Sequence, residues 1–151
     1  MPTYTEKFTW QGKELVIKRS TSPIDVDAVE SETVKLEKIN VNDPNLRPSN
    51  YEVAEGTILP LLGAEGVRID LSKRTKAPMT FWHRNMDCDE VIFCHKGAII
   101  WETELGTITL DAGEMFVIPK GVAHRSLPPP NSETENIIIE LKINGTVSRL
   151  I

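Results

Sequence analysis

Two short stretches of this chain decide its fold: HRNMDCDE at residues 83–90 and GEMFVIPKGVAH at residues 113–124. Both combine short runs of strand-forming residues with Gly, Pro, Asn or Asp, which is typical of strands joined by tight turns. The first stretch contains His83 and Glu90, and the second ends at His124. Two imidazoles and one carboxylate suit a divalent transition metal with open coordination positions, most often Fe(II). We therefore predict one mononuclear metal site inside a small β-barrel.

The composition of the chain is that of a globular protein and sets limits on its partners. Its 151 residues are 40% hydrophobic and 26% charged, with a net charge of -5 at pH 7. The pI near 5.2 argues against nucleic-acid binding, and no basic amphipathic stretch indicates a membrane surface. Residues 1–10 lack the apolar run of a signal peptide, and no segment approaches the ~20 apolar residues of a bilayer span. We expect a cytoplasmic protein that acts on a small molecule.

Short strands account for most of the predicted structure. Helical periodicity is scarce, whereas β-branched or alternating runs bounded by turn residues recur along the chain. The candidate strands are residues 7–10, 15–18, 33–39, 57–62, 66–71, 79–85, 90–95, 98–102, 106–110, 115–118, 123–126 and 136–143. This pattern predicts an all-β sandwich or closed antiparallel barrel. Residues 1–50 are polar and loop-rich, so we interpret them as an extension of strands and loops, with a weakly indicated helix at residues 23–30.

Strand alternation predicts which side chains surround the metal site. His83, Asn85 and Phe81 fall on one face of the strand at residues 79–85, because successive side chains point to opposite faces. Glu90 shares its face with Ile92 in the next strand. The substrate pocket is therefore expected to be lined by Phe81, Ile92, Met115 and Val117, the last two forming one face of their own strand.

Several neighbouring residues offer alternative donors. Asp87 and Asp89 lie in the same loop as Glu90 and could replace it as the carboxylate ligand. Cys88 is a conceivable thiolate ligand in that loop, although the two histidines and the glutamate already supply a complete donor set. His95, the third histidine of the chain, falls on the opposite strand face from Glu90 and is interpreted as a structural or interface residue.

The spacing within the two stretches resembles the two motifs of the cupin superfamily. Residues 83–97 read His-x-Asn, four residues, Glu, six residues and Gly, as in the first motif. Residues 113–124 read Gly, five residues, Pro-x-Gly, two residues and His, as in the second motif. Asn85 stands where most metal cupins have a second histidine, and Pro128 stands where the second motif usually ends in asparagine. The first departure leaves three protein ligands in place of the usual four.

This resemblance implies a fold and a ligand set. It implies a cupin-type double-stranded β-helix, or jelly-roll barrel, over residues 51–151, with residues 1–50 packing on the barrel or on a partner subunit. It also implies His83, Glu90 and His124 as the metal ligands, and a homodimer. The His-Arg-Asn start followed by a glutamate is similar to the metal site of homogentisate dioxygenases, a cupin family with a two-His, one-Glu iron site. In that family the glutamate stands one residue nearer to the histidine.

The expected activity follows from the open coordination positions. Three protein ligands on an octahedral metal leave three positions for water, substrate and dioxygen. We therefore expect an Fe(II) dioxygenase-type oxidoreductase for a small aromatic or organic-acid substrate, with Asn85 as an outer ligand or a substrate contact. A redox-neutral isomerase or lyase that uses Mn, Ni or Zn is an alternative, as is a cupin that binds a small ligand without turnover.

Overall fold

The computed structural model describes residues 3–25, 35–49, 58–74, 78–132 and 134–151. The chain divides into two compact units, Met1–Lys38 and Ile39–Ile151. Each unit is described by itself below. The predicted boundary between residues 50 and 51 lies outside the described residues.

The first unit contains a single β-hairpin in its described part. Strands β1 (Tyr4–Trp10) and β2 (Lys13–Arg19) pair antiparallel, and Trp10 lies opposite Lys13. Gln11 and Gly12 join them with φ angles of 50° and 74°, as in the two-residue turns that match the twist of a hairpin. A 3-10 helix, η1, follows at Pro23–Asp25, and the remainder of the helix expected there lies outside the described residues.

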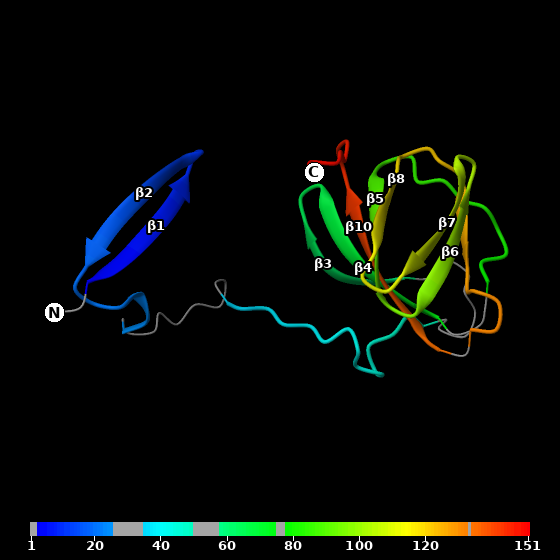
Figure 1. The fold of residues 1–151 in the computed structure, drawn as a ribbon, viewed down its shortest axis with the longest axis horizontal. Coiled ribbons are helices and arrows are strands. Elements are labelled where there is room, and N and C mark those ends of the chain that lie inside the picture. Colours follow the sequence, from blue (N-terminus) through cyan, green and yellow to red (C-terminus); the bar gives the residue numbers. More distant parts are fainter. Residues whose placement is uncertain (1–2, 26–34, 50–57, 75–77, 133) are drawn as a thin grey trace. The chain divides into compact units, whose positions relative to one another are not determined.

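The second unit is a sandwich of two antiparallel sheets, which confirms the predicted all-β jelly roll (Figure 1). Its strands are β3 (Leu59–Ala64), β4 (Val67–Arg74), β5 (Asp89–Lys96), β6 (Ala98–Thr103), β7 (Gly106–Asp111), β8 (Met115–Ile118), β9 (His124–Leu127) and β10 (Asn136–Ile143). One sheet has the order β3-β4-β10-β5-β8 and the other the order β7-β6-β9. In the described part of the chain no helix has the length and apolar character needed to cross a bilayer.

The chain changes sheets at Gly97, between β5 and β6. Gly97 has a φ of 77°, a region that side chains with a Cβ rarely adopt. A Cβ at this position would also lie 2.2 Å from Oδ1 of Asn136, which accepts a hydrogen bond from the backbone N–H of Ala98 at 3.0 Å. Glycine is therefore required at this corner both for its backbone angle and for its lack of a side chain.

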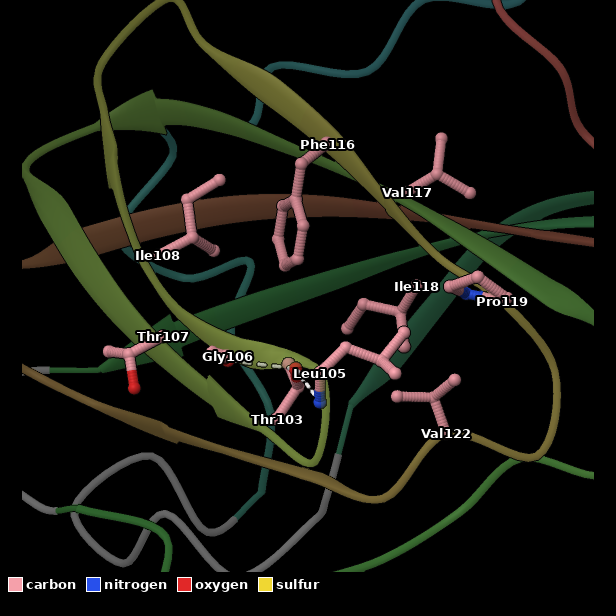
Figure 2. A pocket seen from close by; sticks show the side chains of 10 residues that line it. All are labelled: Thr103, Leu105, Gly106, Thr107, Ile108, Phe116, Val117, Ile118, Pro119 and Val122. Atoms are coloured by element: carbon pink, nitrogen blue, oxygen red, sulfur yellow. Dashed lines mark hydrogen bonds between the residues drawn. The ribbon is translucent and has the colours of Figure 1, made fainter.

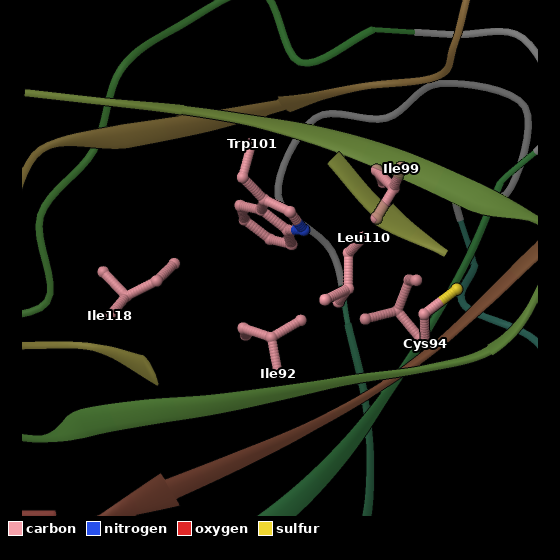
Figure 3. Close-up of a cluster of buried hydrophobic side chains, with 7 residues drawn as sticks. Ile92, Cys94, Ile99, Trp101, Leu110 and Ile118 are labelled. Atoms are coloured by element: carbon pink, nitrogen blue, oxygen red, sulfur yellow. The ribbon is translucent and has the colours of Figure 1, made fainter. Parts of the chain in front are cut away.

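Apolar side chains from both sheets meet in one core between them. Figure 3 shows side chains of β5, β6 and β7 converging with Trp101 among them. The buried cluster consists of Ile92, Cys94, Ile99, Trp101, Leu110, Ile118 and Ile138. Alternation along β5 makes the pattern clear, since Glu90, Ile92 and Cys94 are buried on the inner face while Val91 and Phe93 are only partly buried.

Two of the predicted strands are wrong in the part that the structure describes. Residues 35–39 are in no strand, and residues 33–34 lie outside the described residues. Residues 79–85 form only irregular pairing with β9. The N–H of Met79 donates to the carbonyl of Ser126, and His83 alone forms a β-bridge, to His124. An irregular backbone at this point places the histidine beside the sheet edge without continuing a ladder.

Candidate metal centre

The three predicted ligands come from three separate segments that the fold brings together. Glu90 is the second residue of β5, His124 is the first residue of β9, and His83 lies in the segment that precedes β5. His83 and His124 exchange two backbone hydrogen bonds, with N···O distances of 3.1 and 2.9 Å. The bridge fixes the two histidines as direct neighbours, because residues opposite each other in an antiparallel pair project to the same side.

The donor atoms of the three residues converge on one point. One ligand atom from each of His83, Glu90 and His124 lies within 4.8 Å of the other two. Nε2 of His124 is 3.8 Å from Oε2 of Glu90, and the two imidazole centroids are 4.1 Å apart. Two donors that each bind a transition metal at about 2.1 Å are at most about 4.2 Å apart. The gap between the donors is therefore close to that of a single bound ion.

The side chains that surround this gap are buried or partly buried, which is unusual for polar groups. His124 and Glu90 are 1% and 3% exposed, and His83 is partly buried. Within the described residues, Nε2 of His124 has no hydrogen-bond partner. A buried carboxylate and a buried imidazole nitrogen are costly unless they are paired or coordinate a cation. The donor set and its burial thus fit a divalent metal.

The imidazole of His124 is held in the orientation that a ligand needs. Its Nδ1 lies 2.9 Å from the carbonyl oxygen of Val122. A ring nitrogen that bonds a carbonyl must carry a proton, so in the neutral imidazole Nε2 is the nitrogen left to bind a metal. Metal-binding histidines are commonly fixed by a hydrogen bond of this type from the second ring nitrogen.

The side chain of Asn85 lies beside the candidate centre, in contact with Glu90. The expected role is an outer ligand or a substrate contact, but its Nδ2 donates to Oε1 of Glu90 at 3.1 Å, and its Oδ1 accepts the N–H of Asp87 at 3.3 Å. Both ends of the amide are therefore used within the protein. Asn85 holds the carboxylate whose other oxygen faces His124, so in this structure it positions a ligand.

Two of the alternative donors in the same loop, Asp89 and Cys88, are disfavoured by their surroundings. Asp89 is 4% exposed and accepts the backbone N–H groups of Val147 and Lys120, each at 2.9 Å. These two bonds lower the pKa of the Asp89 carboxyl and commit both oxygens. Burial, with a further contribution from Glu90, raises the pKa of the Cys88 thiol and disfavours a thiolate ligand there.

A surface ion pair ties the two histidine-bearing segments together, and sequence reasoning did not find it. Arg84 Nη1 lies 2.5 Å from Oε1 of Glu104 and donates to the carbonyl of Gly121 at 2.6 Å. Glu104 in turn accepts the N–H of Ala123 at 3.0 Å. The hydrogen bond from Arg84, followed by that from Ala123, lowers the pKa of Glu104. No sequence signal pairs residues 84 and 104, because they are neighbours only in the folded barrel.

The expected pocket residues have mixed outcomes. The ring of Phe81 is 6.2 Å from that of His83, so it lies beside the candidate centre. Ile92 faces inward but is wholly buried in the apolar core. Met115 and Val117, expected to line the substrate pocket, lie on the outer face of β8 and are 64% and 39% exposed. The inner face of β8 carries Phe116 and Ile118 instead.

Val117 does reach a separate pocket of about 310 Å³. Figure 2 shows the Phe116 ring directed into the group of side chains that line it, with Val117 at the rim and pointing away. The phase of a four-residue strand decides which pair faces inward. The pairing of β8 with β5 identifies the two inward-facing residues of β8, because Ile118 lies opposite Glu90 and Phe116 lies opposite Ile92.

Comparisons with known proteins find a curated relative, and several solved structures that share the fold of this barrel. No family model matches the chain. A protein of Saccharolobus solfataricus named "Putative dioxygenase SSO1533" is 28% identical over 75 residues, which cover 50% of this chain and 20% of that protein. The chain thus matches only a fifth of the length of that curated relative.

Solved structures share the fold at low sequence identity. A cupin protein from Bacteroides fragilis superposes with a TM-score of 0.52 at 17% identity, covering 68% of this chain and 92% of its own. A Ralstonia eutropha protein titled a "putative mannose-6-phosphate isomerase" gives a TM-score of 0.55 at 16% identity, covering 73% and 100%. Protein NMB1881 of Neisseria meningitidis gives 0.54 at 23% identity, covering 71% and 99%.

Proposed function

Because this protein has the fold of the cupin superfamily, we propose that it is a mononuclear metal-dependent enzyme, an Fe(II) dioxygenase-type oxidoreductase for a small aromatic or organic-acid substrate. The observation that carries this proposal is the buried convergence of His83, Glu90 and His124. Two imidazoles and one carboxylate are the protein donors of many non-haem Fe(II) oxygenases. The similarity of half the chain to a protein named as a putative dioxygenase points the same way.

The residues around the centre have separate roles in this proposal. His83, Glu90 and His124 would hold the metal, Asn85 orients the carboxylate of Glu90, and the carbonyl of Val122 orients the ring of His124 so that Nε2 faces the metal site. An iron ion held by these three residues would supply the oxygen chemistry, with coordination positions left open for small molecules. The protein side of catalysis is then the fixed orientation of these ligands and the exclusion of competing donors.

A reconstitution experiment tests the metal and the reaction class. We expect the metal-free protein to take up one Fe(II) per chain under anaerobic conditions. The iron-loaded protein is then expected to consume oxygen with at least one member of a panel of catechols, gentisates and β-diketones. Turnover without oxygen consumption contradicts the oxidoreductase and selects an isomerase or lyase that uses Mn, Ni or Zn. Affinity for a small ligand without any bound metal selects a binding cupin.

Matched variants connect the metal to the three residues. His124→Ala and the near-isosteric Glu90→Gln are expected to lose stoichiometric iron and all oxygen uptake. The control for the histidine is His95→Ala, because His95 is exposed and contacts Asn42 on the other face of its strand at 3.0 Å. The control for the carboxylate is Glu65→Gln in the exposed β3–β4 turn. Iron bound equally well by His124→Ala and the wild type would refute the assignment of ligands.

We also propose that the protein acts in the cytoplasm as a homodimer. Large apolar side chains are exposed on the outer face of the five-stranded sheet, Met115 and Val117 among them, and such a patch supports association between subunits. The two cysteines, Cys88 and Cys94, are free, which fits a reducing compartment. Light scattering of the purified protein at a mass of one chain would contradict the dimer.

A further inference from the structure

A pocket of about 450 Å³ lies beside the candidate metal centre and carries two cations. Its lining includes Arg68 from β4, Lys142 from β10 and Asn85, the residue that holds Glu90. The metal-centre proposal uses neither Arg68 nor Lys142. Their position relative to Glu90 follows from the strand register.

Arg68, Lys142 and Glu90 form one row across three adjacent strands. Arg68 lies opposite Lys142, and Lys142 lies opposite Glu90. Side chains in such a row point to the same face of the sheet, so both cations share the inner face with the buried carboxylate of Glu90. Neighbouring strands are about 4.8 Å apart, which places the backbone of Arg68 roughly 10 Å from that of Glu90.

A buried carboxylate holds the two cations in place. Asp70 is fully buried, its oxygens lie 2.9 and 3.0 Å from Nε of Arg68, and Oδ2 lies 3.4 Å from Nζ of Lys142. Asp70 therefore uses only the Nε of the guanidinium. Within the described residues the Nη groups of Arg68 make no hydrogen bond, and the side chain is 49% exposed. The orientation of these remaining donors is fixed in advance by Asp70.

The charge balance shows what the pocket can recognise. Asp70 and Glu140 occupy the next row of the inner face, Glu90 shares the row of the cations, and Asp87 also lines the pocket, so carboxylates outnumber the two cations. Recognition must then come from the directed N–H donors of Arg68 and Lys142 more than from a net positive field. A guanidinium with two free Nη groups is suited to binding an oxyanion with two oxygens, since it forms two parallel charge-assisted hydrogen bonds.

We propose that Arg68 and Lys142 form an anion subsite that binds the carboxylate or phosphate of the substrate while its other end reaches the metal centre. This deepens the proposed function and rests on it for the position of the metal. The substrate class is thereby narrowed to molecules in which an acidic group and a metal-binding group are separated by a few bonds, matching the spacing of the row.

Binding measurements on the zinc-loaded protein under nitrogen test this subsite, because Zn(II) has no redox chemistry. The probes are 3,4-dihydroxyphenylacetate and its neutral amide, which present the same catechol to the metal and differ only in the acid. We expect the acid to bind about tenfold to a hundredfold more tightly, the range for hydrogen bonds to a charged group. Competition by acetate and by inorganic phosphate then distinguishes a carboxylate from a phosphate as the natural group.

Variants assign the preference to the two cations. Arg68→Met and Lys142→Met are each expected to lower the ratio of the acid's affinity to the amide's affinity to one or slightly above one. Lys96→Met removes one positive charge from the exposed end of β5 and is expected to leave the ratio unchanged. Should Arg68→Met fail to fold because Asp70 is left unpaired, Arg68→Lys keeps a cation beside Asp70 and still removes the guanidinium donors. Its expected ratio lies between the wild type and Lys142→Met.

The contrary outcomes are distinct from those of the metal proposal. Equal affinities for acid and amide in the wild type overturn the subsite, as does a preference that persists in both Lys142→Met and Arg68→Lys. Zinc content is measured separately. A chain that binds no zinc contradicts the proposed function. Acetate and inorganic phosphate are then each titrated against the metal-free protein, and whether either binds still decides whether the anion subsite exists.

Discussion

The inner face of strand β5 is buried from Glu90 to Cys94 and changes from polar to apolar along that length. At its start Glu90 is 3% exposed beside His124 at 1%, and further along Ile92 and Cys94 are both fully buried. Burial of apolar surface stabilises a fold by about 25 cal/mol per Å². Burial of a charge costs free energy unless a partner or a cation compensates it. The apolar end of the barrel therefore stabilises the fold, whereas the polar end costs stability unless the proposed metal compensates its charge.

The difference extends to how each end keeps its geometry. The apolar end relies on close packing around Trp101. The polar end relies on directed hydrogen bonds, from Asn85 to Glu90 and from His124 to the carbonyl of Val122. Substitutions at the two ends should therefore separate stability from metal affinity, in the order of expected effect that follows.

The largest effect on stability is expected at the apolar end. Ile99→Ala removes a fully buried side chain from the core and should lower the free energy of unfolding by about 2–5 kcal/mol. The metal affinity of the folded protein should change little. Urea unfolding measures the first quantity and a chelator competition the second. Ile108→Ala is the control, since Ile108 is 41% exposed and should lose much less.

The next largest effect on stability is expected at Gly97, the corner between β5 and β6. Gly97→Ala forces a residue with a Cβ into a left-handed backbone angle, which costs about 1–2 kcal/mol. The new Cβ also displaces Asn136 Oδ1 from the N–H of Ala98, which should add about 1–3 kcal/mol if that donor is left unpaired. Gly145→Ala is the matched control, because no neighbouring atom lies within 4 Å of the place that its new methyl group would take. Equal unfolding midpoints for the two variants would contradict the conclusion that glycine is required at position 97.

At the polar end, Asn85→Ala should act on metal affinity more than on folding. Loss of the hydrogen bond to Glu90 is expected to weaken metal binding by about 10–100-fold, the usual range for a residue that orients a ligand. A fluorescent chelator titration measures the change. Asn45→Ala, an exposed asparagine, serves as the control. An unchanged affinity would mean that Glu90 is oriented by other contacts.

The smallest effect concerns pH and Asp89, next to the polar end. The N–H groups of Val147 and Lys120 lower its pKa in the folded state below the unfolded value of about 3.9. Its contribution to stability is therefore full above that unfolded value and is lost as the pH falls through the lowered folded pKa. The Asp89→Asn variant should have a lower free energy of unfolding at pH 7. That free energy should also change less with pH between about pH 5 and pH 3. Parallel pH profiles of the urea midpoint would contradict this role.

Much of the candidate site was accessible from local sequence. Motif spacing identified His83, Glu90 and His124, and alternation put Glu90 on the buried face of its strand, as the structure shows. Turn residues such as Gly97 marked the corners, because only glycine adopts these backbone angles without strain. These features depend on a few consecutive residues and on the period of a strand.

Other features depended on which strands are neighbours. The outward face of Met115 and Val117 follows from the pairing of β8 with β5, which local alternation in a four-residue strand does not specify. The role of Asn85 follows from the turn that returns its amide to Glu90. Arg84 and Glu104 meet only through the packing of two loops.

The sequence by itself determined an all-β barrel and the identity of three candidate metal donors, because strand period, turn chemistry and ligand type are local properties of the residues. The tertiary structure alone decided which side chains orient those donors and placed Arg68 and Lys142 in a row with Glu90. The physical reason is that cross-strand register joins residues far apart in the chain, and no local pattern records the partner of a strand.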